Sequence, residues 1–283
     1  MIYEFGSKEL RCKADSYGAE LISVLHQGKE RLWQNESGAW SGHAPVLFPF
    51  AGTFAVVVDG VKYPCPRHGF ARQKEFSVFS KTENEITFLL RSDEQTRAWY
   101  PYDFSLFVTY TVVGNCLKVT HKAVNEGQNT MYAGFCCHES FALDGEVNEF
   151  ELVFEKEERF LSPLTLEYDG RLTGEFEDFG TGKVLAFDWE FMQKNSVILA
   201  NTNSHSVSLK RKSTGEILAR VSYPDFPHMV LWSAKKSRML CIEPWQNLPD
   251  DLRTEPQELS LKAGLTAVKA GETLVSKHEI EYF

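Results

Sequence analysis

Hydrophobic and polar residues alternate with a period of two along most of the chain, which is typical of half-buried β-strands. Every second residue is apolar over residues 104–112, the turn signal Gly114-Asn115 follows, and the alternation resumes over 117–123. This pattern predicts a β-hairpin. Further strand pairs are predicted at 76–79 with 86–90, 207–211 with 217–223, and 229–232 with 239–242, and a last strand after Gly271-Glu272.

Helical periodicity is confined to a short stretch at residues 94–100, which ends before Pro101. Many short strands at this spacing predict an all-β fold, either a sandwich or a barrel. We find no low-complexity linker, shift in composition or internal repeat. The sequence therefore predicts one continuous β domain over residues 1–283.

The composition excludes several classes of partner. Among 283 residues, 13% are aromatic and 24% are charged, so the chain is expected to be folded. A formal net charge of −9 argues against nucleic acid and anionic membranes. The longest uncharged run, 44–58, is too short and too interrupted by proline and glycine for a membrane span. The N-terminus lacks a signal sequence, and six cysteines without a CxxC pair indicate reduced thiols, so a cytoplasmic location is predicted.

A carboxylate next to a proline is the first candidate for chemistry. Glu243 follows the apolar run 239–242 and precedes Pro244, which should end the strand there. Trp245 lies two residues further on, and an indole ring can stack on the apolar face of a sugar. Partial burial beside that ring would raise the pKa of Glu243 towards neutral pH. Alone, the motif fits a solvated glutamate at the start of a loop more often than a general base.

Three other stretches carry candidate residues, at 43–49, 66–72 and 134–141. The second contains Arg67, His68 and Arg72 around a glycine, and the third contains His138 within an apolar strand. Such a histidine is more often a core residue than a catalytic one, and Arg72 could simply pair with an acid such as Glu75. No two histidines have the spacing of metal ligands, so no metal site is predicted.

Taken in order, the segments HAPVLFP, HGFAR, His138, CIEPW and PD resemble the aldose 1-epimerase (galactose mutarotase) family. The likeness is greatest to its LacX-like branch and extends to the related glucose-6-phosphate 1-epimerases. The resemblance implies a large antiparallel β-sandwich, the galactose mutarotase-like supersandwich, with an open cleft. It also implies that Glu243 is the base, that His138 is the acid, and that His68 bonds the sugar near its ring oxygen.

The chain departs from the branch pattern at three positions. Thr53 follows Gly52 where the branch has an arginine, Ser140 lies where an HPAFN-like motif is usual, and Ser196 lies where an aspartate tends to bind sugar. The acid–base pair is retained, and the contacts to the sugar hydroxyls are left open.

The resulting hypothesis is an aldose 1-epimerase that interconverts the α and β anomers of a hexose by acid–base chemistry, without a cofactor. Arg72 and Trp245 would line the sugar site. A first alternative is a hexose-6-phosphate 1-epimerase in which Arg67 or Arg72 binds the phosphate. A second is a carbohydrate-binding protein on the same scaffold without turnover. The expected partner is a small-molecule sugar or sugar phosphate, and the sequence leaves the oligomeric state open.

Overall fold

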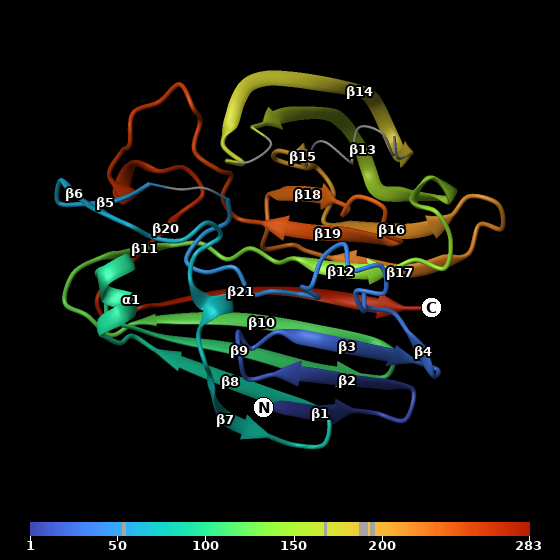
Figure 1. Ribbon diagram of the computed structural model, residues 1–283, viewed down its shortest axis with the longest axis horizontal. Coiled ribbons are helices and arrows are strands. Elements are labelled where there is room, and N and C mark those ends of the chain that lie inside the picture. Colours follow the sequence, from blue (N-terminus) through green and yellow to red (C-terminus); the bar gives the residue numbers. More distant parts are fainter. Residues whose placement is uncertain (53–54, 167–168, 187–191, 193–195) are drawn as a thin grey trace.

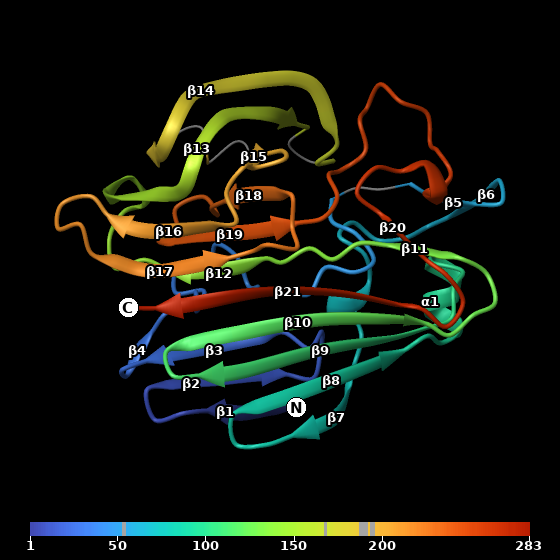
Figure 2. The same ribbon diagram turned by 180° about the vertical axis from the view of Figure 1, so that it is seen from behind.

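The computed structural model describes the chain except for residues 53–54, 167–168, 187–191 and 193–195. A nine-stranded antiparallel sheet forms one layer, and two four-stranded antiparallel sheets lie against the same face of it (Figures 1 and 2). In sheet order, the nine strands are β14 (Leu172–Ala186), β13 (Phe150–Thr165), β16 (Ser206–Arg211), β17 (Ile217–Ser222), β21 (Thr273–Tyr282), β10 (Cys116–Asn125), β9 (Phe104–Val113), β8 (Glu85–Arg91) and β7 (Ser77–Lys81).

The smaller sheets come from different parts of the chain. One is N-terminal, with β1 (Ile2–Gly6), β2 (Leu10–Asp15), β3 (Leu21–His26) and β4 (Lys29–Glu30). The other has the order β12 (Glu139–Ala142), β19 (Met239–Trp245), β18 (His228–Trp232) and β15 (Val197–Leu199). Two-stranded sheets pair β5 (Val56–Val58) with β6 (Val61–Tyr63) and β11 (Met131–Ala133) with β20 (Thr266–Val268).

Helices are few and short among the described residues. The α-helix α1 (Glu94–Trp99) begins at Asp93, whose carboxylate accepts a hydrogen bond from the Thr96 N–H while the Thr96 hydroxyl accepts one from the Asp93 N–H. The 3-10 helices are η1 (Ala71–Gln73), η2 (Val147–Glu149) and η3 (Leu259–Leu261). None of the described helices is long and apolar enough to cross a membrane. The cytoplasmic location and the single-domain boundary stay predictions.

The predicted antiparallel β-sandwich is confirmed, and so are its hairpins and the short helix. The β9–β10 and β16–β17 pairs have the predicted turns, and β21 begins directly after Gly271-Glu272. Alternate residues of β10, including Leu117 and Val119, are buried as their parity indicates. They belong to a continuous apolar core between the nine-stranded sheet and the smaller sheets.

Two details of the prediction are wrong. The strand β19 does not end at Glu243 but continues through Pro244 to Trp245. Although Pro244 has no N–H to donate, it lies opposite Met229 of β18, and its carbonyl accepts a hydrogen bond from the Cys137 N–H. His138 lies outside a regular strand, directly before β12, because the segment after β11 makes only an isolated bridge at Cys136 before pairing resumes at Glu139.

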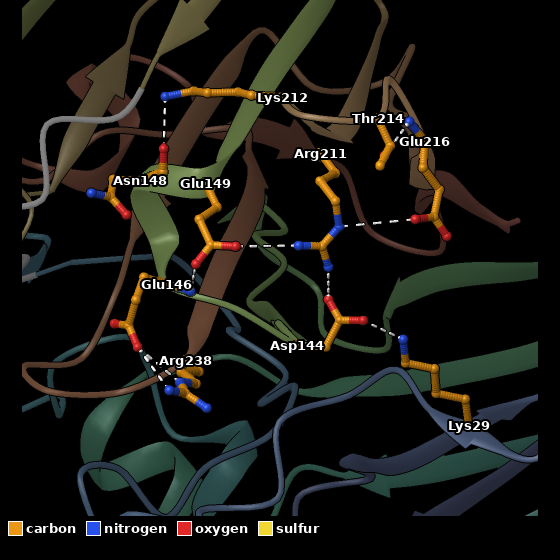
Figure 3. A network of polar contacts seen from close by, with 10 residues as sticks. All are labelled: Lys29, Asp144, Glu146, Asn148, Glu149, Arg211, Lys212, Thr214, Glu216 and Arg238. Carbon is orange, nitrogen blue, oxygen red and sulfur yellow. Dashed lines mark hydrogen bonds and ion pairs between the residues drawn. The ribbon is translucent and has the colours of Figure 1, made fainter.

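A polar network at one end of the sandwich connects the sheets (Figure 3). Arg211 at the end of β16 forms ion pairs with Asp144, Glu149 and Glu216. Asp144 also binds Lys29 of β4, so the network joins the N-terminal sheet to the nine-stranded one. The Arg211 side chain is 15% exposed and its guanidinium lies 4.7 Å from the centre of the Phe150 ring. Burial and shared partners make this network stronger than isolated surface pairs.

Replacing Arg211 with methionine should lower the free energy of unfolding by about 1–3 kcal/mol, because several partly buried contacts are lost together. Arg238→Met is the matched control, since Arg238 pairs with Glu146 but its side chain is 62% exposed. That variant should lose less than about 1 kcal/mol. Urea unfolding at low and high salt measures both variants. Equal losses would contradict a central role for Arg211.

Candidate active site

The pairing of β18 with β19 places several candidate side chains on one face of the small sheet. Val230 lies opposite Glu243, and Trp232 lies opposite Cys241. Directly opposite residues of an antiparallel pair share a face, and side chains alternate along each strand. Glu243 and Trp232 therefore project to the same side, away from Ile242. All seven residues of β19 are buried, so the Glu243 carboxyl group is only 1% exposed.

His138 is brought to Glu243 by the segment that runs beside the end of β19. The Cys137 N–H donates to the Pro244 carbonyl at 3.0 Å, and the Trp245 indole N–H donates to the Cys137 carbonyl at 3.1 Å. The resulting distance from His138 Nε2 to Glu243 Oε2 is 3.5 Å. The predicted acid and base thus face each other.

His68 is fixed by a tight turn that packs against the HAPVLFP segment. His68 and Gly69 have φ angles of 64° and 71°. A Cβ atom on Gly69 would lie 2.0 Å from the Phe48 carbonyl oxygen, so this position requires glycine. The Gly52 N–H donates to His68 Nδ1 at 2.9 Å. Because Nδ1 accepts, the ring proton of neutral His68 resides on Nε2, which is left as a donor.

These elements enclose a cleft of about 350 Å³. All six residues singled out in the sequence contribute to its lining: Arg67, His68, Arg72, His138, Glu243 and Trp245. The remaining lining residues are Trp40, Ser196, Val230 and Trp232. The sequence reasoning missed Trp40, although a tryptophan in a stretch rich in glycine and serine was a usable signal. It also missed Trp232, because only the register of β18 against β19 shows that Trp232 lies on the same face of the sheet as Glu243.

The tryptophans differ in what they offer a ligand. The Trp40 ring stacks on His138 with a centroid distance of 5.2 Å, and the Trp232 ring meets His138 edge-on at 5.9 Å. Both rings are partly exposed, whereas Trp245 is 5% exposed and uses its N–H on the Cys137 carbonyl. Trp40 and Trp232 therefore present more free aromatic surface than Trp245.

Comparison with known proteins identifies the family. A family model described as aldose 1-epimerase matches residues 1–281. The chain belongs to the aldose 1-epimerase family. The plasmid-encoded protein LacX of Lactococcus lactis subsp. lactis is 29% identical over 299 residues, with 99% of both chains covered. A Salmonella typhimurium protein named "Putative glucose-6-phosphate 1-epimerase" is 31% identical over 110 residues, 35% of each chain.

Two solved structures resemble this aldose 1-epimerase family member over its whole length. The galactose mutarotase related enzyme from Lactobacillus acidophilus has a TM-score of 0.90 and 27% identity, with 100% of this chain and 97% of that one covered. A galactose mutarotase-like protein from Lactobacillus casei has a TM-score of 0.92 and 25% identity, with both chains fully covered. The predicted supersandwich fold is thereby confirmed.

The pKa shifts of the residues that line the cleft follow mainly from burial. Desolvation, together with the charge of Glu139, raises the pKa of Glu243 well above its ordinary value. Desolvation also lowers the pKa of His138 to about 4, and Arg72 and Arg67 act in the same direction. Burial lowers the pKa of His68 well below its ordinary value too. In the free protein, burial therefore disfavours the charged forms of both Glu243 and His138.

Arg67 and Arg72 carry the positive charge of the cleft. The Arg72 guanidinium donates to the Arg67 carbonyl at 3.1 Å. Neither guanidinium lies within 4.0 Å of a carboxylate in the described part of the chain, so the alternative pairing of Arg72 with Glu75 is not formed. Asp169 and Glu243 act on Arg67 only at longer range. The two cations are thus placed to meet an anionic group on a ligand.

Two groups of side chains have the composition of metal ligands. Donor atoms of His138, Cys241 and Glu243 lie within 4.8 Å of one another, and so do those of His121, Cys137 and His278. Sequence spacing could not indicate either group, because each joins segments that are about 100 residues or more apart in the chain or lie on different sheets. The first group overlaps the acid–base pair. The predicted absence of a metal site stays a prediction.

The departures from the family pattern fall at different places. Ser196 lines the cleft, where a serine hydroxyl can still bind a sugar hydroxyl. Ser140 is buried, and its hydroxyl donates to the His43 carbonyl, so it stabilises the HAPVLFP segment. Thr53 lies outside the described residues.

The proton distribution can be tested by NMR titration of His138 in the free protein. We expect His138 to remain neutral from pH 8 down to about 5, because burial disfavours the imidazolium. Comparison with His138→Asn assigns the signal. Half-protonation of His138 near pH 6.5 would contradict the dominance of desolvation.

Proposed function

We propose that this protein is an aldose 1-epimerase, a mutarotase that interconverts the α and β anomers of a hexose. The observation that carries the proposal is the buried carboxyl group of Glu243 facing the His138 imidazole at 3.5 Å in a cleft. The cleft volume is in the range of small-molecule sites. Family membership supports epimerase activity on a sugar.

The proposed mechanism needs one base and one acid. The Glu243 carboxylate takes the proton of the C1 hydroxyl while His138 gives a proton to the ring oxygen O5, and the C1–O5 bond breaks. Rotation about C1–C2 then presents the other face of the aldehyde. On closure, O5 attacks C1, His138 recovers the O5 proton and Glu243 returns its proton to the C1 oxygen. Atoms and protons balance over the cycle, and both residues end as they began.

The reactive form differs from the resting form only in the location of one proton. The mechanism requires ionised Glu243 and protonated His138, whereas burial favours the reverse. Both forms carry the same number of protons, so their ratio is independent of pH while the pair holds one proton. A sugar whose C1 hydroxyl donates to Glu243 and whose O5 accepts from His138 stabilises the reactive form. Binding energy is then used to move the proton.

Other residues of the cleft have supporting roles in this proposal. His68 Nε2–H is a donor suited to an oxygen of the sugar ring, as the family resemblance implied. The exposed faces of Trp40 and Trp232 suit the apolar face of a pyranose, with Trp245 forming the wall behind. Arg72 and Ser196 supply polar contacts at the rim.

Glu243→Gln and His138→Asn should each remove most of the catalysed anomer exchange, because each residue contributes about 10²–10⁴-fold. The double variant should be little slower than either single one, since the pair acts as a unit. The rate is followed by polarimetry or by NMR exchange from freshly dissolved α-glucose and α-galactose. Chelation of metal ions should leave the wild-type rate unchanged.

Measuring both sugar binding and anomer exchange with the wild-type protein distinguishes an epimerase from a carbohydrate-binding protein. If it binds sugar but equilibrates the anomers no faster than buffer does, the protein is a carbohydrate-binding protein and the proposed activity is wrong. Near-full activity of Glu243→Gln would contradict the mechanism while leaving the activity intact.

A specific observation favours a second candidate, a hexose-6-phosphate 1-epimerase. Arg67 and Arg72 bring two positive charges to the cleft without a carboxylate within 4.0 Å among the described residues. Paired guanidinium groups suit a phosphate because each can donate two parallel hydrogen bonds. The name of the Salmonella typhimurium relative points to the same substrate class, over about a third of the chain.

Arg72→Met should lower kcat/KM for a 6-phosphorylated hexose by about 10- to 100-fold, the equivalent of one charged hydrogen-bonding contact. The rate with the free hexose should change little. Arg97→Met is the matched control, because Arg97 pairs with Asp103 outside the cleft. Equal effects of Arg72→Met on both sugars would contradict a phosphate-binding role.

A further inference from the structure

One imidazole behind the cleft binds the side chains of both residues that flank His138. His278 Nε2 lies 2.8 Å from Glu139 Oε1, and His278 Nδ1 lies 3.3 Å from Cys137 Sγ. All three side chains are buried. His278 belongs to β21 of the nine-stranded sheet. Glu139 is the first residue of β12 in the small sheet, and Cys137 lies in the segment before it. The contacts therefore join two layers of the sandwich.

Successive side chains in this segment point to opposite sides, which explains why His138 does not contact His278. Glu139 lies opposite Ile242, so its side chain shares the face of Ile242 and points towards the core. Cys137 and Glu139 are two residues apart and both reach His278. His138, between them, projects to the opposite side and lines the cleft beside Glu243.

The His138 side chain has little else to hold it. Its Nδ1 atom is buried and has no hydrogen-bond partner among the described residues. Its Nε2 atom lies 3.5 Å from the Glu243 carboxyl group, and its ring is packed by Trp40 and Trp232. The direction of the ring is therefore set mainly by the backbone at residues 137–139, which His278 holds from behind.

Glu139 is strongly bound within this arrangement. Burial alone would raise the pKa of Glu139, but the charge and hydrogen bond of His278 lower it below its ordinary value. Breaking a buried charged pair by removing one partner is costly, whereas replacing both partners with apolar residues is often neutral for stability. Because apolar replacement of both partners is often neutral, stability alone does not account for a buried Glu–His pair at this place, and a functional role is considered.

We propose that His278, through Glu139 and Cys137, is a positioning residue that holds His138 against Glu243. The inference rests on the proposed epimerase mechanism. His278 touches neither substrate nor reacting atoms. It fixes the backbone on both sides of the acid, so that the imidazole reaches the ring oxygen of a bound sugar while Glu243 reaches the C1 hydroxyl.

We call the contacts of His278 with Glu139 and Cys137 the clamp. The double variant Glu139→Leu/His278→Leu tests this role, since it removes the clamp but leaves no unpaired buried charge. We expect a folded protein with kcat lowered by about 10- to 100-fold, because a displacement of about 1 Å costs on that order. KM should change by less than about threefold, because the residues that line the cleft are untouched. A merely structural role would leave kcat of the folded variant unchanged.

Two further variants sharpen the result. Glu139→Gln keeps an oxygen that can accept from His278 Nε2–H, so it should retain most of the wild-type kcat. His26→Phe is the matched control, because His26 of β3 is a buried imidazole that packs beside the Tyr282 ring at 6.3 Å and does not line the cleft. It should leave kcat unchanged. If the double variant does not fold, Glu139→Ala takes its place, with the same expected loss of kcat.

The outcomes separate this inference from the proposed function. Full kcat in the folded double variant, or in Glu139→Ala, would overturn the positioning role. Equal losses in Glu139→Gln and the double variant would also overturn it, because the glutamine keeps the bond. If Glu243→Gln abolishes turnover while the clamp variants stay fully active, only the inference fails. If Glu243→Gln stays active, the proposed mechanism fails first.

Discussion

Burial of the small sheet on both faces is the constraint on which the site depends. The strand β19 lies between β12 and β18 and is covered over its whole length, so the carboxyl group of Glu243 is removed from water by its own strand. Desolvation is then the largest cause of both the raised pKa of Glu243 and the lowered pKa of His138. The architecture of the sandwich thus disfavours the charged forms of both residues.

The loop that carries His68 depends on the same sheet through backbone contacts. Phe48 forms a bridge with Gly69, and Leu47 forms one with Cys136, so the HAPVLFP segment links the His68 turn to the chain that leads into His138. A side chain at position 69 would collide with the Phe48 carbonyl. The motifs that carry the family resemblance are therefore connected to one another, and the bridges help to set the spacing of His68, His138 and Glu243.

Much of this was accessible from the sequence, because alternation and turn residues determine hairpins locally. The β9–β10 hairpin and the helix at Glu94–Trp99 depend on neighbours in the chain, and they were predicted. The continuation of β19 through Pro244 was not, although Met229 and His228 of β18 lie opposite Pro244 and Trp245. The cleft position of Trp40 and the clamp at His278 are long-range. Family resemblance singled out Glu243 and His138 as the expected base and acid, and the assembled strands bring the two side chains to 3.5 Å from each other.

Because the Gly52 N–H donates to Nδ1 of His68, the neutral ring can donate a hydrogen bond only from Nε2. In the proposed mode of binding, its Nε2–H meets an oxygen of the sugar ring. A carba-sugar, which has a CH2 group in place of the ring oxygen, would present hydrogens to that N–H and leave a buried donor unsatisfied, at a cost of about 1–3 kcal/mol. The cleft would then distinguish a pyranose from a polyhydroxylated carbocycle of the same shape, because only the pyranose has a ring-oxygen lone pair that can accept the hydrogen bond from His68.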